Sequence, residues 1–137
     1  MKKTWGIICA VLMLCVVLCA CQSATAPVVA VGEDQVMSLY SAVGERQVTG
    51  SGSEVNTDYE QKTVSYAGVT AEDLTQYAYV LKDAGFLVTK NTGDTLQLGM
   101  QSVTKGKIVL VDMGYPQDGA VTITYTVAEG TITPSEE

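Results

Sequence analysis

The side chains best suited to covalent chemistry are four cysteines, and all of them lie within the first 21 residues. A thiol is a strong nucleophile that can be alkylated, can be oxidised or can bind a metal. Cys21 follows a segment in which Lys2 and Lys3 precede an unbroken run of aliphatic residues, Cys and Met from Ile7 to Ala20. This order of positive charge, apolar run and small residue is typical of a secretory signal peptide.

The sequence Leu18-Cys19-Ala20-Cys21 resembles the lipobox of bacterial lipoproteins, in which an aliphatic, a variable and a small residue precede the lipidated cysteine. The resemblance implies cleavage after Ala20 and a diacylglyceryl thioether on Cys21, which becomes the mature N-terminus. Cys19 is a competing candidate, but Leu18 would then occupy the position before the cut, where a small residue is required. We therefore predict a lipid anchor at Cys21, on the extracytoplasmic face of the cell membrane.

An uncleaved membrane helix over residues 5–21 is the alternative to a signal peptide. Its length is at the lower end of the roughly 17 to 25 residues that cross a bilayer. No basic residue follows it to stop transfer, so we favour cleavage. Both interpretations place the remaining chain outside the cytoplasmic membrane.

The chain that remains after residues 1–20 are removed is strongly acidic. Two of the 8 basic residues are lost and all 15 acidic residues are kept, so the net charge is 6 minus 15, or −9. Nucleic acid binding requires clustered Lys and Arg, and anionic lipid headgroups also require positive charge. We therefore expect no nucleic acid partner, and a charged protein or small ligand is expected to be cationic.

The chain after residue 20 has few residues that are suited to catalysis. It has no His, and no Cys follows Cys21, which removes the usual general base and the preferred zinc ligands. Ser102 and Lys105 match the Ser-x-x-Lys motif of penicillin-binding enzymes, but they are expected in a hairpin turn and the partner Lys-Thr-Gly motif is missing. We predict no catalytic residue and no cofactor, and hence a protein that is not an enzyme.

Several carboxylates could in principle bind calcium, namely Glu72, Asp73, Asp94, Asp112 and Asp118. None of them has the Asp-x-Asp-x-Asp-Gly spacing of a calcium loop, so we predict no metal site.

Tyrosine is frequent, with 7 residues against a single Phe. Three tyrosines are in phase with predicted core faces: Tyr66, Tyr77 and Tyr125. Three others are not in phase and are the predicted partner contacts: Tyr59, Tyr79 and Tyr115. Exposed Tyr is enriched at protein interfaces, which is the reason for this assignment.

The best-defined element is a helix from Thr70 to Gly85. Thr70 is a suitable N-cap, and Asp73 is placed to bond back to it in a capping box. Gly85 is expected in the left-handed conformation at the helix end, where Phe86 packs back on Leu81.

Alternating or apolar runs predict strands over Thr63 to Tyr66, Phe86 to Lys90, Thr95 to Gln101, Lys107 to Met113 and Ala120 to Ala128. The last four are separated by short turns, which indicates an antiparallel meander with the helix on one face. The predicted fold class is α+β.

The remaining segments complete the predicted organisation into one small domain. We expect a signal peptide at 1–20, a lipidated N-terminus and flexible tether at 21–32, the domain at 33–128 and a frayed tail at 129–137. Spacing predicts a short helix over 33–44, with a strand over 37–43 as the alternative. Residues 45–62 are polar and contain Gly50-Ser51-Gly52-Ser53, which favours a mobile loop.

Residues 66–86 combine Tyr66, Val69, Glu72-Asp73-Leu74, Tyr77, Leu81 and Gly85-Phe86. With the strands that follow, this pattern resembles small secreted or lipidated domains of Gram-positive bacteria whose function is unassigned. The resemblance implies a fold and carries no functional residue. We therefore expect a membrane-tethered, non-enzymatic binding or accessory domain, with an acidic inhibitor or structural partner of a basic cell-envelope enzyme as the alternative.

Overall fold

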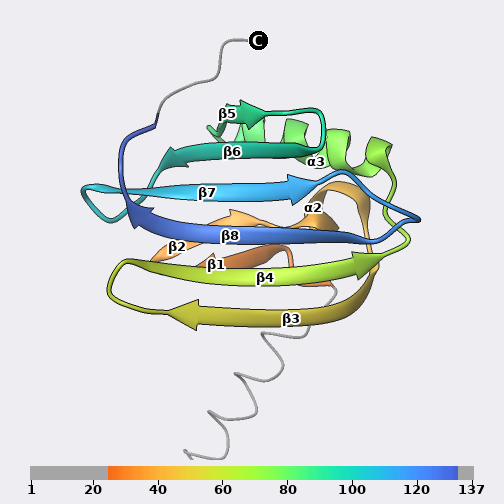
Figure 1. The fold of residues 1–137 in the computed structure, drawn as a ribbon, viewed down its shortest axis with the longest axis horizontal. Coiled ribbons are helices and arrows are strands. Elements are labelled where there is room, and N and C mark those ends of the chain that lie inside the picture. Colours follow the sequence, from red (N-terminus) through yellow and green to blue (C-terminus); the bar gives the residue numbers. More distant parts are fainter. Residues whose placement is uncertain (1–24, 133–137) are drawn as a thin grey trace, which may run out of the picture.

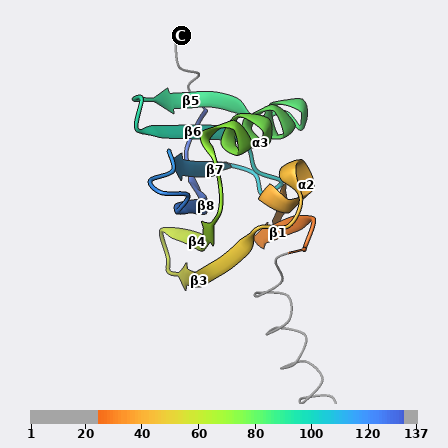
Figure 2. The same ribbon diagram turned by 90° about the vertical axis from the view of Figure 1, so that its right-hand side faces the viewer.

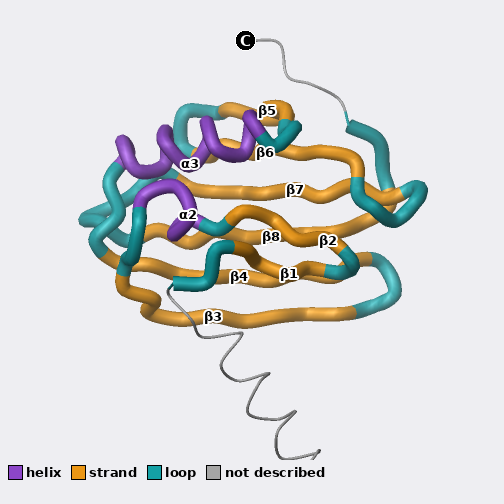
Figure 3. The backbone as a smooth tube through the Cα atoms, turned by 180° about the vertical axis from the view of Figure 1, so that it is seen from behind, coloured by secondary structure: helices purple, strands orange, loops and turns teal. Residues whose placement is uncertain are grey.

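The computed structural model describes residues 25–132. Its elements are β1 (Val28–Val31), β2 (Asp34–Met37), α2 (Leu39–Val43), β3 (Gln47–Val55), β4 (Tyr59–Ala67), α3 (Ala71–Asp83), β5 (Leu87–Asn91), β6 (Thr95–Gln101), β7 (Lys107–Gly114) and β8 (Val121–Glu129). Six of the strands form one antiparallel sheet with the order β3-β4-β8-β7-β6-β5 (Figure 1). Both helices and the β1–β2 hairpin lie over one face of this sheet, as Figures 2 and 3 show.

The helix α3 begins and ends as its sequence predicts. The Thr70 hydroxyl accepts a hydrogen bond from the Asp73 amide at 3.0 Å, and the Asp73 carboxylate accepts one from the Thr70 amide at 3.1 Å. At the other end the Phe86 amide donates to the Leu81 carbonyl at 3.0 Å, which is the long bond of a Schellman motif. Gly85 has a φ of 112°, which a residue with a Cβ rarely adopts.

The last four strands form the predicted antiparallel meander. Val111 on β7 lies opposite Leu98 on β6 and Tyr125 on β8, and all three side chains are fully buried. Because side chains alternate along a strand, this inner face collects the apolar residues that pack against α3. The sheet then continues beyond β8 through β4 to β3.

The N-terminal segment corrects two predictions. Val28–Val31 is strand β1, whose Val31 is fully buried, so residues 28–31 are not a tether. Asp34–Met37 is strand β2, and only Leu39–Val43 of the predicted 33–44 helix is helical. The sequence resembles a single helix because Val36 of β2 and Leu39 of α2 both point into the same core, and their spacing of three residues matches a helical turn.

The prediction of a mobile loop over 45–62 is also wrong. Gln47–Val55 is strand β3 and pairs with β4, which begins at Tyr59 and includes the predicted strand over 63–66. At the edge of the sheet, both faces of β3 are largely exposed, so the strand needs no apolar alternation and its sequence shows none. Backbone pairing with β4 stabilises it instead.

The predicted frayed tail is wrong for its first residues. Glu129 is the last residue of β8, and the Gly130 amide donates to the Gly106 carbonyl at 3.3 Å. Ile132 lies over the sheet, since a Cβ on Gly99 would be 2.9 Å from its Cδ1 atom. Residues 133–137 lie outside the described part. Neither helix between residues 25 and 132 is long and apolar enough to cross a bilayer.

Candidate functional site

Two of the three predicted contact tyrosines lie at one cavity. Tyr79 on α3 and Tyr115 after β7 line a hollow of about 160 Å³ between the helix and strands β5, β6 and β7. Its apolar lining consists of Leu74, Ala78, Val88, Leu96 and Met113. Its polar lining consists of Thr75, Tyr79, Lys82, Asn91 and Tyr115.

The helix α3 supplies both kinds of lining through its periodicity. Leu74 and Ala78 are four residues apart, so they lie on the same buried face. Tyr79 follows Ala78 on the helix and points away from the buried face. It is 61% exposed to solvent. The Lys82 Nζ atom lies 5.7 Å from the centroid of the Tyr79 ring, close enough for a cation–π interaction. Lys82 was not singled out from the sequence, although its spacing of three residues from Tyr79 predicts this contact.

Tyr115 is positioned by the sheet and Tyr59 lies elsewhere. The Tyr115 amide donates to the Asp94 carbonyl at 3.0 Å, and its half-buried ring packs against the core. Tyr59 stands at the start of β4 and donates its hydroxyl to the Glu54 carboxylate at 3.0 Å. The structure therefore brings Tyr79 and Tyr115 together and leaves Tyr59 out of the cavity.

The cavity is suited to binding one small apolar group. Its volume is below the roughly 300 to 1,000 Å³ of a typical small-molecule site. Its lining contains hydroxyls, one carboxamide and one ammonium, but no carboxylate, thiol or imidazole that could act as a general base.

Ser102, the candidate nucleophile of the Ser-x-x-Lys pattern, is part of a buried turn. Its hydroxyl donates to one carboxylate oxygen of Asp34 at 2.5 Å, while the Val103 amide donates to the other oxygen at 2.9 Å. The Thr104 amide donates to the Ser102 hydroxyl at 2.9 Å. These bonds fix the β6–β7 turn to β2, which gives Ser102 a structural explanation. Asp34 could not be found from the sequence, because it lies 68 residues from Ser102.

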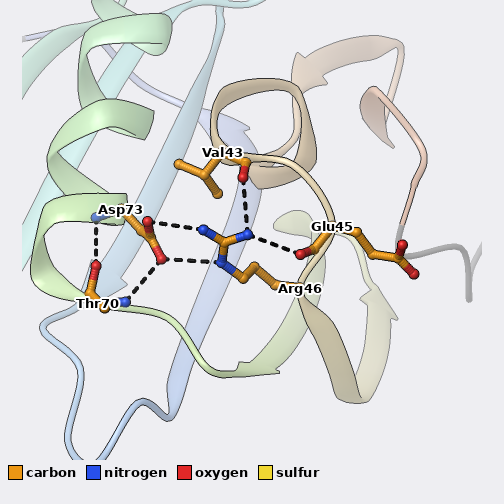
Figure 4. A network of polar contacts seen from close by, with 5 residues as sticks. All are labelled: Val43, Glu45, Arg46, Thr70 and Asp73. Atoms are coloured by element: carbon orange, nitrogen blue, oxygen red, sulfur yellow. Dashed lines mark hydrogen bonds and ion pairs between the residues drawn. The ribbon is translucent and has the colours of Figure 1, made fainter.

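Asp73 joins the two helices through a bidentate ion pair (Figure 4). Arg46 donates from Nε to Asp73 at 3.2 Å and from Nη2 at 3.1 Å, and also donates from Nη1 to the Val43 carbonyl. Burial acts to raise the pKa of Asp73, but hydrogen bonds from Arg46 and Thr70 outweigh it and lower that pKa. The role visible for Asp73 is therefore structural.

Asp112 is a half-buried carboxylate on the outer face of the sheet. Gln97 Nε2 donates to it at 2.7 Å. Burial raises the pKa of Asp112, and the Gln97 bond and nearby Lys90 oppose that rise. Within residues 25–132, no three carboxylates or other ligating groups are arranged to hold a metal ion.

Cys21, the predicted lipidation site, lies outside the described residues. The fold begins shortly after it, since the Ala26 carbonyl accepts a bond from the Ser38 hydroxyl at 2.5 Å and the Pro27 carbonyl accepts one from the Ser38 amide at 3.0 Å.

Comparison with protein-family models, with curated proteins and with solved structures finds no match to this chain. A fold alone does not determine an activity, so the indications of function lie in the residues of the candidate site.

Proposed function

We propose that this protein is a lipoprotein anchored through Cys21 to the extracytoplasmic face of the cell membrane, where it acts as a non-enzymatic binding or accessory domain. We further propose that its contact site is the cavity beneath Tyr79 and Tyr115. The observation that supports this proposal is the convergence of the exposed Tyr79 and the half-buried Tyr115, from distant parts of the sequence, on one cavity with an apolar lining.

The anchor would hold the domain close to the bilayer. Five residue steps separate Cys21 from Ala26, where the fold begins, and they span at most about 18 Å when fully extended. In Figure 2 the described chain begins beside β1, whereas α3, β5 and β6 lie toward the other end of the sheet. The cavity would therefore face away from the anchored end and toward other envelope proteins.

The occupant that fits best is a single apolar side chain of a protein partner. An anchor side chain buried in a well-packed pocket, ringed by contacts that exclude water, is the usual centre of such interfaces. Tyr79 would supply exposed ring surface for this contact. Lys82 lies over that ring, so a partner group entering the cavity would pass both an aromatic surface and an ammonium.

A bulky substitution at the cavity tests this proposal. Thr75 lines the cavity and is exposed, whereas its exposed neighbour Gln76 does not line it. Thr75→Trp should place a large ring over the mouth, and Gln76→Trp adds the same ring one helix position away. The full chain and both variants would be cross-linked in membranes, and the captured partners quantified by mass spectrometry.

We expect a partner that is captured equally by the wild type and Gln76→Trp, and at least about tenfold less by Thr75→Trp. Equal capture of every partner by all three proteins would refute the cavity as the contact site.

The net charge of −9 after residue 20 favours a second candidate, an acidic inhibitor or structural partner of a basic cell-envelope enzyme. In that case the dominant partner would be a basic hydrolase, released by salt and indifferent to Thr75→Trp, because exposed charge contacts are screened.

A further inference from the structure

The outer face of the sheet, opposite α3, carries a row of polar side chains. Figure 1 views this face from the front, with both helices behind the strands. Strand pairing places Lys90, Gln97, Asp112, Thr124 and Thr63 opposite one another in sequence across β5, β6, β7, β8 and β4. Neighbouring strands are about 4.8 Å apart, so the row presents a regular ladder of hydrogen-bonding groups.

Two members of this row are held in place by hydrogen bonds. The Thr89 hydroxyl donates to Gln97 Oε1 at 2.7 Å, and Gln97 Nε2 donates to Asp112 Oδ1 at 2.7 Å. The Gln97 carboxamide therefore accepts a bond from Thr89 and donates one to Asp112, and these two bonds orient the Asp112 carboxylate. A group oriented in advance loses less entropy when it binds a ligand.

A wide hollow of about 600 Å³ opens beside Asp112 on this face. Its volume falls within the roughly 300 to 1,000 Å³ of small-molecule sites. The segment between β7 and β8 forms one wall. The lining is Thr95, Asp112, Met113, Gly114, Tyr115, Gln117, Asp118, Ala120, Val121, Thr122 and Thr124.

The chemistry of the lining selects the ligand. Three threonine hydroxyls, a carboxamide and two carboxylates offer both donors and acceptors, and a phenol ring adds an apolar surface. No Lys or Arg lines the hollow, so anionic ligands such as phosphates and acidic sugars would be repelled by Asp112 and Asp118. A ligand whose own groups both donate and accept, and which is not negatively charged, matches this lining.

We propose that this hollow is a binding site for a neutral saccharide. Sugar hydroxyls would donate to Asp112 and exchange hydrogen bonds with Thr124, Thr122 and Gln117. Gln97 donates to Oδ1 of Asp112, and among the ion pairs of the described residues none includes Asp112, so its Oδ2 atom can accept from a ligand. This hollow shares Met113 and Tyr115 with the cavity at Tyr79, but the groups proposed to bind the sugar, Asp112, Thr122 and Thr124, do not line that cavity, so the proposal does not depend on it.

The site is tested by titrating the full chain, in a detergent without a sugar headgroup, with four neutral disaccharides. The probes are cellobiose, maltose, lactose and N,N′-diacetylchitobiose at millimolar concentrations, followed by calorimetry. Two variants remove ligand contacts, Asp112→Asn and Thr124→Val. Thr126→Val is the matched control, because Thr126 is on the same face of β8 but does not line the hollow. Thermal unfolding of each variant shows whether the fold is kept.

We expect at least one disaccharide to bind the wild type and Thr126→Val equally, and to bind Asp112→Asn and Thr124→Val about tenfold or more weakly. Asp112→Asn should not lower the unfolding temperature, which separates a binding role from a structural one. The proposal is overturned if no disaccharide binds, or if the two site variants bind as well as the control.

Discussion

The hydroxyl oxygens of Tyr77 and Tyr125 lie 2.8 Å apart in the core, where both side chains are fully buried. The Tyr77 hydroxyl also donates to the Met37 carbonyl at 2.6 Å, so its single proton is committed there. Tyr125 must therefore be the donor to Tyr77. Burial raises the pKa of both phenols, which keeps both protonated at any physiological pH. This chain of bonds joins β8, α3 and the β1–β2 hairpin.

The direction of these bonds predicts unequal effects of two similar substitutions. Tyr125→Phe removes one donor and leaves the bond from Tyr77 to Met37 intact, so it should cost about 0.5 to 1.5 kcal/mol of unfolding free energy. Tyr77→Phe removes both bonds and leaves the buried Tyr125 hydroxyl without its acceptor, so it should cost about 2 to 4 kcal/mol. Urea unfolding measures both values. A larger loss for Tyr125→Phe would reverse the assigned donor order.

The helix end predicts a contrast between two glycines. Gly85→Val forces a β-branched residue into a φ of 112°, and we expect a loss of about 2 kcal/mol or more. Gly52 lies on the exposed edge strand β3 without positive φ, and a Cβ there meets no atom within 4 Å. Gly52→Val should therefore be neutral or slightly stabilising, since Val favours strands. Equal melting temperatures for the two variants would contradict the Schellman ending of α3.

What the sequence could predict depended on whether the signal was local. Thr70, Asp73 and Gly85 fix the ends of α3 through bonds within a few residues, and the meander from β5 to β8 follows from short turns. The strands β1 and β3 were missed because their pairing partners, rather than their own patterns, stabilise them. The cavity could be predicted only in part. Tyr79 and Tyr115 were out of phase with the core, but their convergence required the tertiary fold.

The ion pair of Asp73 predicts a particular pH dependence. The pKa of Asp73 is lowered in the folded protein, so its contribution to stability is present above the unfolded value of about 3.9 and is lost as pH falls through the folded pKa. At neutral pH, Asp73→Asn should lose about 1 to 2 kcal/mol by weakening the capping box and the bond to Arg46.

Urea unfolding of the wild type and Asp73→Asn between pH 7 and pH 3 checks this sign. The difference between the two proteins should shrink at the acid end. Asp112→Asn is the control of opposite sign, because the pKa of Asp112 is raised and its ionisation costs stability as pH rises. A gap between wild type and Asp73→Asn that widens in acid would show that Asp73 is not stabilised as a carboxylate.

The buried turn predicts a structural phenotype for Ser102. Ser102→Ala leaves one oxygen of the buried Asp34 carboxylate without its hydroxyl donor, and we expect a loss of about 1 to 3 kcal/mol. The same protein should show no turnover of ester or β-lactam substrates that depends on Ser102. We also expect EDTA and reductant to leave the unfolding temperature unchanged. Turnover abolished by Ser102→Ala would make the protein an enzyme, and a large loss of stability in EDTA would indicate a metal site.

Metabolic labelling with palmitate shows whether Cys21 carries the proposed lipid anchor. Two acyl chains bury enough CH₂ groups, at about 0.8 kcal/mol each, to hold the domain on a membrane. Cells expressing the wild type, Cys19→Ser or Cys21→Ser would be labelled and the purified proteins compared by autoradiography and by the mass of the N-terminal peptide. We predict label in the wild type and Cys19→Ser, a mature chain that starts at residue 21, and no label in Cys21→Ser. Label that persists in Cys21→Ser and disappears in Cys19→Ser would contradict lipidation of Cys21.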